Sequence, residues 1–231
     1  MKVQIPPFVT IDYKFFLIAL VLLWMPRQVL RLGSRPVKSK RRSQRAEEQD
    51  PRKILEAGDP SIIFSVEFSK FRNYVDFLRG LAGSVAIMGT TWGVESCLQS
   101  AGDLSPTKLL VLRSAILLVG VLIQCFRFEN RFTMYAPLFF ISGISVGLCG
   151  VTVAGFALVL IWTINTGLRS PTLFLTFYAL LIAIFSAFFL GYKSVVIYIA
   201  PVIFFLPVLI SLMAQRPLVM FARKHHDSDE S

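Results

Sequence analysis

Charged side chains are scarce in this sequence of 231 residues. Asp, Glu, Lys and Arg make up 16% of it, and hydrophobic residues make up 55%. Charged residues average about 25% of a soluble domain. Several apolar stretches also reach the roughly 18 to 20 residues needed to cross about 30 Å of hydrocarbon. The shortage of charge therefore excludes an ordinary soluble domain and predicts an integral membrane protein.

Histidine and cysteine are also scarce. The two histidines, His225 and His226, stand side by side near the C-terminus, with no ligand partners at metal-binding spacing in an ordered element. The three cysteines, Cys97, Cys125 and Cys149, share no CxxC spacing, which argues against a disulfide framework or a zinc site. We expect them to be small buried apolar residues, and we expect no metal and no cofactor.

Sequence signatures of catalysis are missing too. There is no HExxH motif, Walker loop, nucleophile elbow or dinucleotide fingerprint. No paired carboxylates fall deep within an apolar run, and the two halves of the chain do not repeat, which weakens an inverted-repeat transporter. An enzyme is therefore the weaker expectation.

Long apolar runs are what the sequence does contain. They predict an all-α fold, a polytopic integral membrane helix bundle with about six transmembrane helices, five being the alternative. The first run ends at Trp24 and Pro26 without a small-x-small cleavage pattern, so we interpret it as a retained helix rather than a signal peptide. The predicted spans cover about residues 8–25, 75–97, 109–126, 132–162, 172–190 and 195–214.

The composition divides the chain into five segments. Residues 1–26 form an N-terminal transmembrane anchor, and residues 27–58 form a basic cytoplasmic linker that has little to bury and is expected to be mostly disordered. Residues 59–74 are expected to form an amphipathic interfacial helix. It leads into a five-helix transmembrane bundle, residues 75–214, and a charged C-terminal tail, residues 215–231.

The distribution of basic residues predicts the orientation. Of the 24 Lys and Arg, 12 lie between Arg27 and Arg72, and cytoplasmic loops of membrane proteins carry such an excess. We therefore expect the protein to lie in the plasma membrane with its N-terminus outside and residues 27–74 in the cytoplasm. With six spans, 15 basic residues lie inside and six lie outside, namely Lys2, Lys108, Arg169, Arg216, Arg223 and Lys224. The last three argue mildly for five spans and an inside C-terminus.

The same basic segment indicates what the protein contacts. Lysines and arginines beside a span are attracted to anionic lipid headgroups, so residues 27–45 are expected to lie on the bilayer. No aromatic residues are interleaved with them, as a surface that stacks nucleic-acid bases would have. The expected partners are the lipid bilayer and another membrane protein or a second copy of the chain, with no nucleic acid.

Polar residues cluster where the second span begins. Asn73, Asp76 and Arg79 are spaced i, i+3 and i+6, which keeps them roughly on one side of a helix. Long side chains at that depth reach toward the headgroups. The structural interpretation is a salt-linked helix entrance, and the alternative is a functional polar site. At the opposite face, Glu95 and Arg113 are expected to form an intramembrane ion pair on adjacent helices.

Small residues recur on one face of two spans. Such residues let helix backbones approach closely in lipid, so the second and fourth spans are expected to pack together. The predicted faces are Ala82, Ala86, Gly89 and Gly93 in the second span, and Gly143, Gly147, Gly150 and Ala154 in the fourth.

The start of the second span, YVDFLRGLAGSVAIMGTTWG, resembles the first-helix signature of the integral-membrane acyltransferase-3 family. Asp76, Arg79, Gly80 and Ala82 match its Asp-x-x-Arg-Gly-x-Ala pattern. The resemblance covers about 20 residues, and it implies a histidine eleven residues after the arginine. That position holds Thr90, and no predicted span contains a histidine, so the family's acyl-transfer chemistry does not carry over.

Three functions follow as hypotheses. The first is a non-enzymatic membrane protein that acts through helix packing and through partner or lipid contacts. The second is a small transporter or channel subunit with a water-accessible cavity lined by Asp76, Arg79, Glu95 or Arg113. The third is a membrane enzyme of the acyltransferase type that acts on lipid or glycan, although it lacks the catalytic histidine.

The predicted Glu95–Arg113 pair is tested by a double-mutant cycle. We expect Glu95→Gln and Arg113→Met, alone and together, to change the free energy of unfolding non-additively, with a coupling of about 0.5–3 kcal/mol. An unpaired charge within a span is costly, so removing both groups harms less than the sum of the single changes. Unfolding in detergent micelles measures these effects, and additive effects would contradict the predicted pair.

Overall fold

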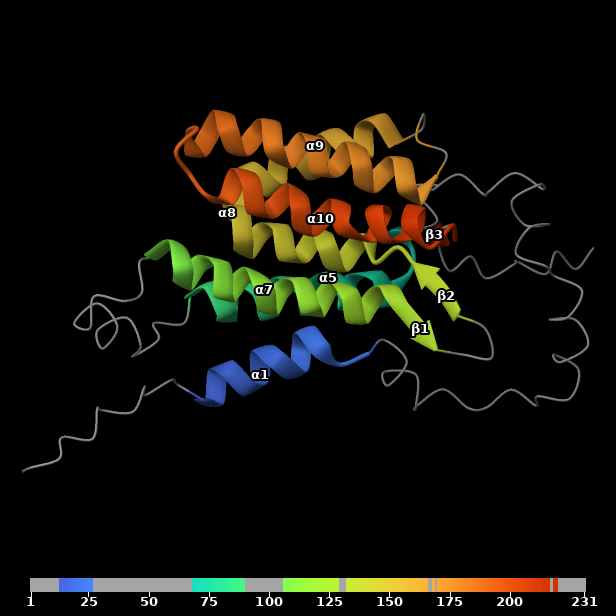
Figure 1. Cartoon of the computed structure of the whole chain (residues 1–231), viewed down its shortest axis with the longest axis horizontal. Helices are drawn as coiled ribbons and strands as arrows, with labels where there is room; N and C mark the ends of the chain where they lie inside the picture. The colour runs from blue at the N-terminus through green and yellow to red at the C-terminus, as the bar shows by residue number, and fades with distance from the viewer. Residues whose placement is uncertain are drawn as a thin grey trace, which may run out of the picture.

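The computed structural model describes residues 13–26, 68–89, 106–128, 132–165, 168, 170–216 and 218–219. Three short strands in these ranges are β1 (Phe126–Phe128), β2 (Phe132–Tyr135) and β3 (Leu218–Val219). The six helices are α1 (Tyr13–Trp24), α5 (Phe71–Gly89), α7 (Pro106–Cys125), α8 (Leu138–Ile164), α9 (Pro171–Leu190) and α10 (Val196–Met213) (Figure 1). Each helix coincides with one predicted span, and the all-α bundle is confirmed.

By length and composition alone, four of the described helices could cross a membrane, namely α7, α8, α9 and α10. They support a multi-pass membrane protein. Only 12 residues form α1, and α5 carries Arg72, Asp76 and Arg79 within its 19 residues. The membrane crossings of α1 and α5 therefore stay predictions.

Helix α8 reverses direction at Gly150. Its 27 residues would form a rod about 40 Å long if straight, yet the rings of Phe139 near its start and Trp162 near its end lie 5.6 Å apart. Gly150 has φ 86° and ψ 160°, a backbone conformation that is essentially restricted to glycine. The prediction of one long fourth span was wrong, because this glycine turns the run into a helical hairpin.

The hairpin decides which helix ends lie together. Strands β1, β2 and β3 follow α7, precede α8 and follow α10, and they form one sheet in that order, so these three helix ends meet. We call this end of the molecule the strand end (Figure 1). The end of α1 lies there too, because Gln124 in the last turn of α7 donates a hydrogen bond to the carbonyl of Met25.

Ends of α5, α8 and α9 also lie at the strand end. Phe68, just before α5, packs on both Phe139 and Trp162, and Trp162 packs on Phe174 in the first turn of α9. The start of α5, both ends of α8 and the start of α9 are therefore at the strand end. The chain leaves α10 at the same end as it leaves α1. The six-span expectation placed the C-terminus at the same end as the start of α1. That placement was wrong, because the hairpin in α8 adds one reversal of the chain direction.

The sheet itself was not predicted. β1 and β2 are antiparallel, with Phe126 opposite Met134, and β3 adds in parallel beside β2, with Leu218 opposite Met134. Strands of two to four residues are too short to show an alternating pattern in the sequence. Leu218 and Met134 are buried, so the first residues of the expected charged tail belong to the fold.

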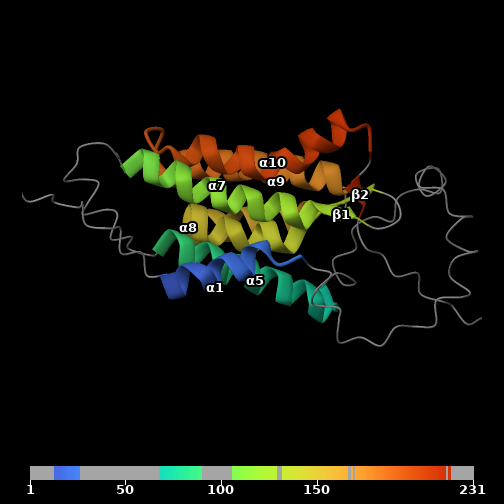
Figure 2. The same cartoon turned by 60° about the horizontal axis from the view of Figure 1, so that its bottom comes forward.

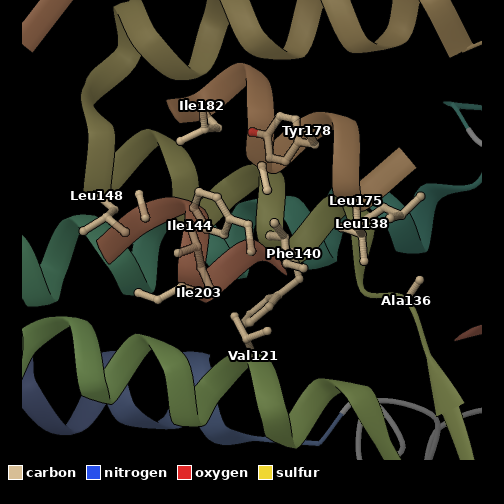
Figure 3. Packing of buried hydrophobic residues seen from close by; sticks show 14 of the residues in the cluster. Val121, Ala136, Leu138, Phe140, Ile144, Leu148, Leu175, Tyr178, Ile182 and Ile203 are labelled. Atoms are coloured by element: carbon tan, nitrogen blue, oxygen red, sulfur yellow. The ribbon is translucent and has the colours of Figure 1, made fainter. Parts of the chain in front are cut away.

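The core lies between three layers of helices. Figure 2 shows α1 and α5 on one side of the bundle and α9 and α10 on the other, with α7 and α8 between them. Side chains from α7, α8, α9 and α10 meet in the centre, among them Val121, Ile144, Ile182 and Ile203 (Figure 3). The hydroxyls of Ser145 and Tyr178 lie 2.6 Å apart within this core and link α8 to α9.

Helices α5 and α8 pack backbone against backbone. A Cβ atom on Gly143 would collide with the carbonyl oxygen of Phe77, and one on Gly80 would collide with the carbonyl oxygen of Phe140. Gly147 lies in the same way against Ser84. The second and fourth predicted spans therefore do pack together, as the small residues indicated.

The prediction chose the wrong residues on α5, however. Ala82 and Gly89 are exposed and Ala86 is half-buried, and nothing lies within 4 Å of the position a Cβ would take at Gly89. Gly80 and Ser84 make the contact instead. On α8, Gly143 and Gly147 are in the contact and Ala154 is buried in the core, whereas Gly150 is the exposed turn. The spacing of small residues shows that they share one side of a helix, but it does not show that this side contacts the neighbouring helix.

The α5–α8 contact gives a matched pair of substitutions within one helix. Gly143→Ala should lower the free energy of unfolding by about 1–3 kcal/mol, because the added methyl group overpacks a backbone contact. Gly155→Ala, where nothing lies within 4 Å of the added atom, should leave stability unchanged or raise it by up to about 1 kcal/mol. Unfolding in micelles, followed by tryptophan fluorescence, measures both. Equal effects would contradict the contact.

Candidate functional site: a buried arginine beside an aromatic pocket

Arg79 of α5 is buried where three helices meet. Its side chain is 5% exposed, and its Nη1 lies 3.4 Å from the Oδ1 of Asp76, one turn earlier. Its Nε donates to the carbonyl of Leu22, 3.2 Å away, and its Nη2 donates to the carbonyl of Met25. The guanidinium also lies 5.9 Å from the ring centre of Phe140.

These contacts complete the C-terminal end of α1. The last four carbonyls of a helix have no partner within it, and they carry the negative end of the helix dipole. Arg79 therefore binds both a carboxylate and a partly negative helix end. Gln124 of α7 adds bonds to the carbonyls of Leu23, at 3.3 Å, and Met25, at 2.8 Å. Trp24 donates to the carbonyl of Ile116 on α7, at 3.2 Å.

The side chain of Leu23 locks the same end of α1. It is fully buried, between Gly83 of α5 and Gly120 of α7. A Cβ on Gly83 would come within 2.6 Å of the Leu23 Cγ, and one on Gly120 would come within 3.4 Å of the Leu23 Cβ. Two glycines thus leave the slot that Leu23 fills, and α1 is bound by both shape and hydrogen bonds.

The structure brings together the three residues predicted as a polar site. Asn73, Asp76 and Arg79 are all buried on one side of α5. Arg79 contacts Asp76 and the end of α1 rather than an open cavity, so the geometry favours the interpretation as a salt-linked helix entrance. It gives no support to a transport pathway through these two residues.

A second feature of the strand end is an apolar pocket of about 730 Å³. It lies between α5 and the two ends of α8. Its lining includes Phe68, Tyr74, Phe77, Phe139 and Trp162, with Leu158, Val159, Ser142 and Thr163 completing it. This volume falls in the range of sites that bind small molecules.

The aromatic rings of the pocket support one another. Phe68 packs edge-on against Trp162, with ring centres 4.9 Å apart, and against Phe139 at 5.4 Å and Tyr74 at 6.2 Å. Edge-to-face pairs of this kind add stability beyond the burial of their area. The pocket wall is therefore preformed by ring packing across α5 and α8.

Two hydroxyls in this lining, those of Ser142 and Thr163, already have hydrogen-bond partners. The Ser142 hydroxyl donates to the carbonyl of Leu138, at 2.9 Å, and the Thr163 hydroxyl donates to the carbonyl of Val159, at 2.7 Å. Both bonds stay within α8, so neither hydroxyl is activated by a base. Among the residues that the structure describes, no group of three His, Cys, Asp or Glu could hold a metal ion.

Sequence reasoning missed this pocket. Its walls come from α5 and from both ends of α8, which only the reversal at Gly150 brings together. Tyr74, Phe77 and Trp162 were visible as aromatic residues near span ends, but their proximity was not.

Several predictions lie outside the described residues. Among them are the linker over residues 27–58, most of the interfacial helix over 59–74, and the two histidines in the tail. Glu95, Gly93, Cys97 and Thr90 also lie outside, so the expected ion pair has only its Arg113 half in α7. Cys125 and Cys149 are free and buried, as expected of small apolar residues.

No protein-family model, curated protein or solved structure matches this chain. The likeness of the Asp76–Arg79–Gly80 stretch to the acyltransferase-3 signature rests on that motif alone.

The contacts of Arg79 predict a large effect of its removal. Arg79→Met should lower the free energy of unfolding by about 3–5 kcal/mol, because it leaves the buried Asp76 carboxylate without its arginine partner. Arg79→Lys should rescue only part, since an ammonium lacks the planar fork that bonds several oxygens. Leu78→Met, at an exposed neighbour in α5, is the control. Unfolding in micelles should separate the three, and Arg79→Met with control-like stability would refute the role.

Proposed function

We propose that this protein is a non-enzymatic, multi-pass membrane protein that binds the apolar part of a membrane lipid in the aromatic pocket at its strand end. The observation that carries the proposal is the 730 Å³ pocket walled by Phe68, Tyr74, Phe77, Phe139 and Trp162. Apolar and aromatic walls with few polar groups are typical of sites for hydrophobic ligands.

The pocket opens toward the lipid-facing side of the helices. Three of its lining residues are exposed: Tyr74 on α5, and Val159 and Thr163 on the second half of α8. Val159 is 70% exposed, at the rim of a pocket that lies within the outer turns of these helices. A ligand that enters between α5 and α8 therefore arrives from the bilayer, which favours a lipid over a water-soluble molecule.

The polar residues support binding rather than chemistry. Arg79, paired with Asp76, is used in the docking of α1, and the hydroxyls of Ser142 and Thr163 donate to their own helix. A catalytic role requires a nucleophile or an acid within hydrogen-bond reach of a base. The described pocket lining offers apolar contact area and no such pair.

Two valines of α8 give a sharp test. Val159 lines the pocket, whereas Val151 is equally exposed at the far end of the same half-helix. Val159→Trp should fill the mouth of the pocket and reduce the lipid that copurifies in mild detergent by about tenfold, which corresponds to roughly 1.4 kcal/mol. Val151→Trp should retain the wild-type amount. Native mass spectrometry of the intact protein counts the bound lipid.

A third variant checks the wall rather than the mouth. Trp162→Ala removes the ring that contacts Phe68, Phe139 and Phe174, so it should also weaken retention. If Val159→Trp and Val151→Trp keep the same lipid as wild type, the pocket is not the binding site and the proposal fails.

A further inference from the structure

The reversal at Gly150 changes which side of the membrane each segment belongs to. The chain leaves α1, α7 and α10 at the strand end, and it enters α5, α8 and α9 there. Both helix ends that flank the connections 27–67 and 129–131 and the connection between α8 and α9 therefore lie on one side, and so does the end of α10. The opposite side has the chain before α1, the connection between α5 and α7, and the turn at Gly191.

Basic residues follow this division closely. Of the 24 Lys and Arg, 18 belong to the strand-end side and three to the other. Those on the strand-end side are the 12 between Arg27 and Arg72, with Arg127, Arg131, Arg169, Arg216, Arg223 and Lys224. The other side has Lys2, Lys108 and Lys193. With six simple spans, 15 Lys and Arg would lie on one side of the membrane and six on the other. The reversal at Gly150 therefore makes the difference in basic residues between the two sides larger.

The pocket lies at this basic side. Its lining comes from the first turns of α5 and α8 and from the last two turns of α8, all at the strand end. The same side carries ten Asp and Glu against its 18 Lys and Arg, so its positive charges exceed its negative ones by eight. Two described basic residues, Lys70 and Arg72, lie between Phe68 and Tyr74 of the lining, so a lipid whose chain occupied the pocket would have its headgroup near them.

We infer that the pocket takes anionic phospholipids from the cytoplasmic leaflet. The inference rests on the lipid-binding role proposed above and adds the charge class of the lipid and the leaflet. Cytoplasmic segments carry the excess of Lys and Arg, so the strand end is cytoplasmic. Basic segments at a membrane surface attract anionic headgroups. The apolar wall supplies the site for the chain, and the surrounding charge selects the headgroup.

The topology is tested with two exposed positions at opposite ends of α10. In the full chain with Cys97→Ser, Lys193→Cys should react with a membrane-impermeant maleimide in intact cells. Ala214→Cys should react only after the cells are permeabilised. Both positions are exposed, so a difference reports the side of the membrane. The reverse pattern, or labelling of both in intact cells, would overturn the assignment of the leaflet.

The preference for anionic lipid is tested with the protein in vesicles that contain equal amounts of phosphatidylglycerol and phosphatidylcholine. The wild type should retain phosphatidylglycerol at least about fivefold over phosphatidylcholine, as expected when one or more basic residues act on the headgroup. Val159→Trp should abolish this enrichment and Val151→Trp should keep it. High salt should reduce the enrichment, because exposed charges are screened.

The outcomes separate the two proposals. Equal retention of both lipids, lost in Val159→Trp, would overturn the inference and leave the lipid-binding role standing. Enrichment of phosphatidylglycerol that survives Val159→Trp would place the anionic lipid on the basic surface outside the pocket, and it would overturn both. Retention of neither lipid would overturn both as well.

Discussion

The bundle depends on the close contact between α5 and the first half of α8. In a membrane, apolar side chains gain little by leaving the lipid for one another, so helices associate through close packing and polar contacts. Gly80, Gly143 and Gly147 allow the two backbones to meet. The first half of α8 then lies in the centre, with α5 on one side and α9 on the other (Figure 2). The pocket and the docking place of α1 are both built around this contact.

The acid and the base at the start of α5 have a structural explanation in that arrangement. A guanidinium buried among helices requires acceptors for its hydrogen bonds, and Arg79 finds them on Asp76 and on the carbonyl end of α1. The positive charge therefore joins two helices whose apolar faces would otherwise give weak specificity. The same feature explains why α1, a short and mostly apolar helix, has a defined place in the bundle.

The sequence was sufficient for the helices but not for their connection in space. Apolar runs located all six described helices, with ends that differ from the predicted ones by up to eight residues, and the break between the last two was expected, because span length and hydropathy are local properties. The reversal at Gly150 was not visible, since a glycine in an apolar run is as common in a packing face as in a turn. Gly143 and Gly150 look alike in the sequence, and only their backbone conformations separate them. The pocket followed from that reversal and was missed with it.

The contacts of α1 set the order in which the molecule is completed. The partners of its carbonyl end are distant in the chain: Arg79 lies 57 residues beyond Leu22, and Gln124 lies 99 residues beyond Met25. During synthesis α1 emerges before α5 and α7, yet both must be in place before its last turn is satisfied. A helix that is made early is thus fixed late. Until then its last carbonyls lack the partners that the folded molecule provides.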